Sequence, residues 1–138
     1  MLAYLGVLMW YLPFWHAVAF VAVHNGLLGL YLGMAFVVNH TGMPVLESST
    51  GDADYLRTQV TTARNLPGGW WLTFLLGGLN FQIEHHLWSG MPHYALRKAA
   101  SIVQPFCEKR GIPYHVVSPW KAVTEVYVHL REMAQYAA

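Results

Sequence analysis

Residues 15–38 read WHAVAFVAVHNGLLGLYLGMAFVV, about 24 residues without a formally charged side chain. A helix rises about 1.5 Å per residue, so this stretch reaches roughly 36 Å and can cross a hydrocarbon core of about 30 Å with some tilt. Gly26, Gly29 and Gly33 leave room for a closely packed neighbouring helix. The stretch predicts a membrane-spanning helix, and the alternative is a buried helix of a soluble protein.

The sequence before this helix is also apolar. Met1 to Tyr11 is too short to cross a bilayer, which takes about 20 residues. We predict the truncated end of a membrane helix rather than a signal peptide, because the segment lacks a basic start and apolar sequence resumes at once. Tyr11, Phe14 and Trp15 are expected at the membrane interface, around a short turn at Pro13.

Composition divides the chain into an apolar and a water-facing part. The chain is 55% hydrophobic and 11% charged, against about 25% charged in ordinary soluble domains. All eight Lys and Arg residues lie between Arg57 and Arg131, which predicts a cytoplasmic C-terminal part. The net charge of +1, without long basic clusters, gives no case for nucleic acid. The single cysteine, Cys107, excludes an internal disulfide and suits a reducing compartment.

Two short segments follow the predicted span. Thr41 to Gly69 is polar and carries the Ser48-Ser49-Thr50-Gly51 cluster; within it, Asp54 to Asn65 predicts a short helix on the membrane surface, ended by Pro67-Gly68-Gly69. Trp70 to Leu79 is apolar but only about ten residues long. It fits a re-entrant or interfacial segment, or a helix buried under others, rather than a span.

The remaining sequence predicts two amphipathic helices. The first opens at Pro92 and ends at Gly111, and the second runs from Pro119 to Met133. Their expected core-facing stripes, at three-to-four spacing, are Leu96, Ala99, Val103 and Phe106, then Trp120, Val123, Tyr127, Leu130 and Met133.

These segments predict an all-α fold with integral membrane helices: one full span, one truncated helix and one short interfacial or re-entrant segment. A cytoplasmic helical cap completes it. The expected division is residues 1–40 as a transmembrane hairpin, 41–91 as an interfacial segment and 92–138 as cytoplasmic helices.

Residues 80–88, NFQIEHHLW, contain the only adjacent histidines, His85 and His86. Imidazole is the commonest side-chain metal ligand near neutral pH, and His40 ends the predicted span on the same side of the membrane. The three histidines therefore predict a metal site at the membrane surface, and imidazole suits iron, copper or zinc. If helical, His85 and His86 point about 100° apart, so they could serve two ions or two positions on one.

Nearby polar residues are candidate further ligands or groups that orient the rings. They are Gln82, Asn39, Asn80 and Glu84. His16 and His24 are interpreted as interfacial or structural, and His93, His115 and His129 have no partner at ligand spacing. An alternative is a non-catalytic membrane protein whose histidines are interface anchors or form a single zinc site.

Several of these stretches resemble membrane fatty acid desaturases. Gly77 to Trp88 resembles the family's last histidine box, in the form Gln82-x-x-His85-His86 that is typical of front-end and related acyl desaturases. Phe36 to Pro44 resembles the Asn-His-x-Gly segment after the last membrane helix, and Gln59 to Asn65 resembles the connecting segment. Met91-Pro92 with Leu96, and Gly111 to Tyr114, resemble the tail. The likeness covers nearly the whole chain and is closest to bacterial, actinobacterial-type members.

The resemblance implies an O2-dependent di-iron desaturase that introduces a double bond into an acyl chain, carried as acyl-CoA or acyl-lipid. Electrons would come from a ferredoxin- or cytochrome b5-type donor. By the same resemblance, His40, His85 and His86 would be iron ligands, and Gln82 stands at the first ligand position of the box. A sphingolipid desaturase and a membrane hydroxylase of the same superfamily are alternatives.

One departure from the family pattern is large. The family has two earlier boxes, His-x-x-x-His and His-x-x-His-His, and neither spacing occurs before His40. The sequence is therefore expected to be the C-terminal part of one membrane desaturase domain. It would hold an incomplete ligand set for two iron ions and would be inactive alone.

Overall fold

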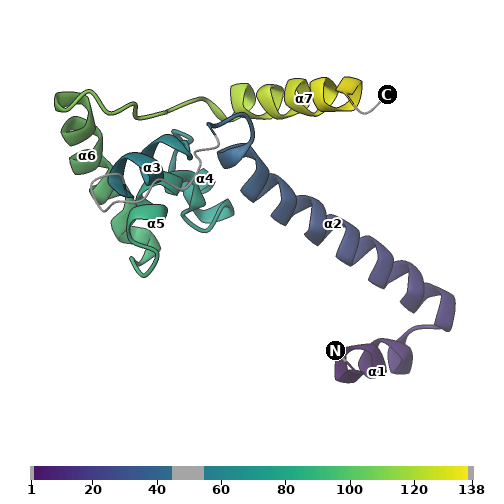
Figure 1. Cartoon of the computed structure of the whole chain (residues 1–138). Helices are drawn as coiled ribbons and strands as arrows, with labels where there is room; N and C mark the ends of the chain where they lie inside the picture. Colours follow the sequence, from purple (N-terminus) through teal and green to yellow (C-terminus); the bar gives the residue numbers. More distant parts are fainter. Residues whose placement is uncertain (1, 45–54, 137–138) are drawn as a thin grey trace. The chain divides into compact units, whose positions relative to one another are not determined.

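The structure is a computed structural model that describes residues 2–44 and 55–136, and these residues are all-helical apart from loops (Figure 1). The helices are α1 (Leu2–Tyr11), α2 (Phe14–His40), α3 (Tyr55–Thr61), α4 (Trp70–Leu75), the 3-10 helix η2 (Leu79–Phe81), α5 (Gln82–Leu87), α6 (His93–Lys109) and α7 (Pro119–Tyr136). The chain forms two compact units, Met1–Met34 and Ala35–Ala138. The boundary falls within α2, so the last turn of α2 belongs to the second unit. The predicted polar cluster at residues 48–51 lies outside the described residues.

The long helix of the first unit confirms the prediction of a helix over residues 15–38. Within the described ranges, α2 is the one helix long and apolar enough to cross a membrane, and only 11% of its most apolar window is buried. Leu27 and Leu30 are more than 60% exposed. A core helix of a soluble protein would bury such side chains, so α2 has the surface expected of a membrane span.

The first unit also holds α1, which is separated from α2 by a turn at Leu12 and Pro13. Tyr11, Phe14 and Trp15, the aromatic residues flanking this turn, are exposed. The hydroxyl of Tyr4 lies 2.8 Å from Nδ1 of His24. His24 therefore has a partner inside the first unit.

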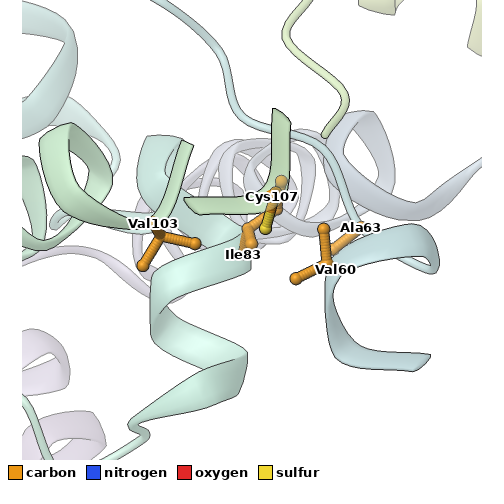
Figure 2. Packing of buried hydrophobic residues seen from close by; sticks show 5 residues of the cluster. All are labelled: Val60, Ala63, Ile83, Val103 and Cys107. Atoms are coloured by element: carbon orange, nitrogen blue, oxygen red, sulfur yellow. The ribbon is translucent and has the colours of Figure 1, made fainter. Parts of the chain in front are cut away.

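The main core of the second unit lies where α3, α5 and α6 meet (Figure 2). Its buried residues are Val60, Ala63, Ile83, Val103 and Cys107. Helix α5 has six residues, which is too short for an isolated helix to be stable in water. Its stability must come from packing, chiefly through the fully buried Ile83.

A second cluster joins the last turn of α2 to α7. It contains Val38, Leu66, Ala122 and Val126. Because Leu66 follows directly on the segment after α3, this cluster and the main core share one stretch of chain. The residues on that stretch can therefore contact both α2 and α5.

A double glycine turn leads from α4 towards the adjacent histidines. Gly77 and Gly78 have φ values of 56° and 86°, a left-handed conformation that glycine adopts without strain. The amide of Gly78 donates to the Thr73 carbonyl at 2.8 Å, which closes the end of α4. At Gly78 an added Cβ would lie 2.9 Å from Nδ1 of His93, so α6 approaches the backbone closely here.

Two predictions for the middle of the chain are corrected. Helix α3 ends at Thr61 rather than Asn65, because Asn65 forms a parallel β-bridge with Val116. The amide of Asn65 donates to the His115 carbonyl at 2.9 Å, and this tertiary pairing replaces the last helical turn. The start predicted at Asp54 lies outside the described residues. Helix α4 has no buried residue, which rules out a buried helix there and leaves the interfacial or re-entrant interpretation.

The bounds predicted for α6 are confirmed, and α7 continues three residues beyond Met133. The predicted stripes are partly wrong. Phe106 is 39% exposed and lies under Arg110, 3.7 Å from ring centre to guanidinium carbon, while Cys107 fills the core instead.

In α7 the buried face is the one that carries Ala122 and Val126. Most of the predicted core stripe is exposed, namely Trp120, Tyr127, Leu130 and Met133. Glu125 lies on the buried side and pairs with the buried Arg64. A buried cation needs an anionic partner. Because Glu125 must reach Arg64, the face of α7 that carries Ala122 and Val126 packs inward.

Candidate metal centre

The side chains of His40 and His86 come together from α2 and α5. Their rings stack with centroids 5.0 Å apart and an angle of 20° between planes. The amide nitrogen of Gln82, one turn before His86, lies 3.2 Å from Nε2 of each ring. Nε2 of His40 and Nε2 of His86 therefore face the same point. The amide NH2 group of Gln82, the positive end of the amide dipole, occupies that point.

The second ring nitrogen of His40 indicates which tautomer faces this point. Nδ1 lies 3.4 Å from the carbonyl oxygen of Thr62, and a carbonyl only accepts hydrogen bonds. Nδ1 therefore carries the proton in the neutral ring, and the lone pair on Nε2 points to Gln82. A backbone carbonyl that fixes the tautomer of a histidine is a common arrangement in metal sites.

His86 is partly buried, and its pKa is lowered by burial first and then by its electrostatic interaction with His40 and His85. A lowered pKa keeps the imidazole neutral at pH 7, and a histidine must be neutral to bind a metal. The pKa direction and the ring geometry therefore agree.

His85 lies apart from the other two histidines. Its ring centroid is 6.5 Å from that of His86, with the planes tilted by 48°. Both residues are in α5, so the divergence follows from helical geometry, as predicted for adjacent residues. Among the described residues, no three His, Cys, Asp or Glu side chains meet closely enough to hold a metal ion. The metal role of His40, His85 and His86 stays a prediction.

The two candidate asparagines brace the backbone on either side of the histidines. The fully buried Asn39 donates to the Leu79 carbonyl at 3.1 Å, which links the end of α2 to η2. Asn80 donates to Thr73 and, at 3.4 Å, to the Leu66 carbonyl. Both amides therefore hold the segments that carry His40 and α5, and their hydrogen bonds go to backbone carbonyls and to Thr73 rather than to a candidate imidazole.

Glu84 is fully buried, and its hydrogen-bond partners are residues other than the candidate histidines. Its carboxylate accepts from Asn65 Nδ2 at 2.7 Å and from the Tyr114 hydroxyl at 2.8 Å. Burial raises the pKa of Glu84, and the hydrogen bonds from Asn65 and Tyr114 oppose that rise. Burial, followed by the neighbouring Glu84 charge, raises the pKa of Tyr114 well above its usual range. Tyr114 therefore stays a hydroxyl donor to Glu84 at neutral pH.

The structure adds residues that the sequence analysis did not single out. Arg64 is 2% exposed and donates to the Val38 carbonyl at 2.7 Å and to the Thr41 carbonyl at 2.9 Å. Asn65 and Tyr114 surround Glu84. The only indication in the sequence was that Arg64 and Asn65 lie within Gln59 to Asn65, which resembles a family segment. That resemblance does not reveal which residues they contact.

Buried polar atoms test whether this group of side chains suits a cation. Nδ1 of His86 and Oε1 of Gln82 are buried without a hydrogen-bond partner among the described residues, as are Oδ1 of Asn39 and Oδ1 of Asn80. Buried polar atoms are almost always paired, so Oε1 of Gln82, which belongs to the amide between the two rings, indicates a further interaction at this point. Two convergent imidazoles, with an amide oxygen one bond rotation away, are a donor set suited to a divalent transition metal. The residues present therefore fit part of a metal site.

Comparisons with known proteins show the family to which the chain belongs. The fatty acid desaturase family matches residues 1–118, and the chain belongs to this family. An acyl-lipid (9-3)-desaturase of Physcomitrium patens is 36% identical over 135 residues, which is 98% of this chain and 25% of that protein. A Delta(5) fatty acid desaturase of Caenorhabditis elegans is 34% identical over 110 residues, 78% of this chain and 25% of that protein.

A third relative is a desaturase of sphingolipids. A Delta 8-(E)-sphingolipid desaturase of Lachancea kluyveri is 36% identical over 100 residues, 72% of this chain and 17% of that protein. The chain spans about a quarter of the length of the first relatives, as expected for a partial desaturase sequence. No solved structure matches it significantly.

Proposed function

We propose that this chain is the C-terminal part of an O2-dependent di-iron acyl desaturase and that it supplies some of the iron ligands. The observation that carries the proposal is the convergence of the His40 and His86 nitrogens on Gln82, at 3.2 Å each. Membership of the fatty acid desaturase family supports the reaction class. The rest of the ligand set would come from polypeptide outside this chain.

In this proposal each candidate residue has a separate task. His40 and His86 bind one iron ion. His85, whose ring leaves α5 in a different direction, binds the second ion. Gln82 either ligates or keeps the two rings apart, and Asn39 and Asn80 brace the flanking segments. When bound, the iron supplies the O2 activation that protein side chains cannot provide for removing hydrogens from an acyl chain.

The membrane arrangement is proposed from the sequence and supported by one candidate span. Helix α2 crosses the bilayer, and the second unit lies on the cytoplasmic side because all Lys and Arg residues follow α2. The exposed aromatic residues of α4, Trp70, Trp71 and Phe74, contact membrane lipid at the interface. The fatty acyl substrate reaches the site from the bilayer, and a ferredoxin- or cytochrome b5-type protein donates electrons from the cytoplasm.

Expression of the complete reading frame that encodes this chain, in a host without the corresponding double bond, tests the proposal. We expect a new unsaturated acyl product in the lipid profile and its loss, by at least 100-fold, in His86→Ala. His129→Ala is the matched control and should retain activity, because His129 lies in α7 and takes no part in the hydrogen bonds of the candidate site. Desaturation that survives His40→Ala and His86→Ala together would refute the proposal.

A sphingolipid desaturase is the second candidate, and the 36% identity with the Lachancea kluyveri protein favours it. The same expression experiment separates the two. Analysis of the released fatty acids and of the sphingoid bases shows which pool gains the double bond. A product confined to the sphingoid bases would select the second candidate.

A further inference from the structure

Two consecutive residues, Arg64 and Asn65, contact the two elements that carry His40 and His86. The side chain of Arg64 binds the end of α2, and the side chain of Asn65 binds the first turn of α5. Asn65 lies in extended chain, paired with Val116. Successive side chains of an extended segment point to opposite sides, so one dipeptide can hold two different elements.

Arg64 completes the C-terminal end of α2, where the last carbonyl groups of a helix have no partner within the helix. Its guanidinium donates to the carbonyls of Val38 and Thr41, and its backbone amide donates to the Asn39 carbonyl at 3.2 Å. The bonded carbonyls lie on both sides of His40. A buried positive charge at a helix C-terminus is also stabilised by the helix dipole. Glu125 of α7 neutralises Arg64 from the outer side.

Every hydrogen-bonding group of the Asn65 side chain contacts either α5 or Tyr114, which itself binds Glu84 of α5. Oδ1 accepts from the amide of Ile83 at 3.0 Å, and that amide belongs to the first turn of α5. Nδ2 donates to Glu84 and to the Tyr114 hydroxyl, each at 2.7 Å. An aspartate here could not donate and would place a second carboxylate against Glu84.

We propose that Arg64 and Asn65 are positioning residues that together fix the separation of His40 and His86. The inference rests on the proposed iron-binding function of these histidines. The carbonyl of Thr62, two residues earlier, contacts His40 Nδ1, so the same short segment also orients that ring. Neither Arg64 nor Asn65 touches the converging imidazole nitrogens.

The test compares iron affinity with the stability of the metal-free protein, using the complete protein in detergent. In Asn65→Asp we expect iron affinity, measured by competition with a chelator, to fall by about 10- to 100-fold. The melting temperature of the metal-free protein should also fall, because the variant loses two buried hydrogen bonds. Val103→Ala, which weakens the main core without removing a contact of Arg64 or Asn65, should lower the melting temperature but reduce iron affinity much less. Arg64→Lys is the second variant, since lysine keeps the charge but not the planar set of donors. It should show the same pattern with a smaller loss of affinity.

Gln104→Glu is the matched control. It also places a new carboxylate beside an existing one, because Gln104 donates to Glu108 at 2.9 Å on the exposed face of α6. It should leave iron affinity unchanged. Unchanged affinity in both Asn65→Asp and Arg64→Lys would overturn the inference, and so would an equal loss of affinity in Val103→Ala at a comparable fall in melting temperature. Failure of the unmodified protein to bind iron would instead overturn the proposed function.

Discussion

Leu27 in α2 and Ile83 in α5 are both aliphatic residues in helices, but Leu27 is 62% exposed and Ile83 is fully buried. The contrast holds more widely across the two units. The first unit turns its large apolar residues outward, whereas the second buries polar ones, namely Asn39, Arg64, Asn65, Asn80, Gln82 and Glu84.

The exposed apolar residues of the first unit and the buried polar residues of the second suit different surroundings. A helix in hydrocarbon satisfies its backbone groups internally and presents apolar side chains to lipid. Buried polar groups need matched partners, and in the second unit most of these partners fix the end of α2 or the start of α5. Exposed apolar surface thus suits membrane anchoring, and buried polar contacts suit a site that depends on fixed geometry.

The largest expected effect is a loss of stability when Ile83, rather than Leu27, is shortened to alanine. Ile83→Ala removes a fully buried side chain from the main core and should lower the free energy of unfolding by about 3 to 4 kcal/mol. Leu27→Ala should change it by less than about 0.5 kcal/mol, since Leu27 has few protein contacts to lose. Chemical unfolding of the detergent-solubilised protein measures both. Similar losses in the two variants would contradict the contrast between the units.

A charge in α2 should have the next largest effect, on membrane insertion. Leu27 lies at the middle of α2, where arginine costs about 2.5 to 3.5 kcal/mol of insertion free energy. Leu27→Arg should therefore reduce the inserted fraction in a glycosylation-based insertion assay. Trp120→Arg, at an 83% exposed position of α7, should leave insertion unchanged. Equal insertion of all three proteins would mean that α2 is not a span.

Local patterns in the sequence were enough to predict some parts of this structure. The long charge-free run predicts α2 because it is one continuous stretch. The apolar segments that end at His40 and precede the adjacent histidines predict that these residues reach the same side of the membrane, and the structure stacks the ring of His86 on that of His40. The predicted end of the helix at Asn65 was wrong because pairing with Val116, about fifty residues away, overrides local helix propensity.

The supports of the candidate site could not be predicted for the same reason. Arg64 contacts Val38 across 26 residues, and Tyr114 contacts Glu84 across 30. The face of α7 that packs inward is decided by Glu125 reaching Arg64, whereas its apolar periodicity favours the exposed Trp120 side. Periodicity identifies a helix well, but the partner of each face depends on the rest of the fold.

The two glycines of the turn before α5 provide a matched pair of substitutions, with a smaller expected effect on stability. Gly77 and Gly78 both have positive φ, but only at Gly78 would an added Cβ meet α6. Gly77→Ala should cost about 1 kcal/mol, from backbone strain alone. Gly78→Ala should cost about 1 to 3 kcal/mol more, because the new methyl group would press on His93. Thermal unfolding compares them, and equal losses would mean that α6 does not pack closely against this turn.

The smallest effect concerns the single cysteine, and it tests the core of the second unit directly. Cys107 is fully buried, and burial, followed by the charge of Glu84, raises its pKa. The thiolate is the reactive form, so Cys107 should react with maleimide at least about tenfold more slowly than a thiol introduced by Ser101→Cys in a Cys107→Ala background. Ser101 is exposed on the same helix. Because the pKa of Cys107 is raised, its labelling should also increase at a higher pH than labelling of the Ser101→Cys variant. Equal rates and equal pH profiles would show that the junction of α3, α5 and α6 is open to solvent, and the contrast with the exposed apolar surface of α2 would no longer hold.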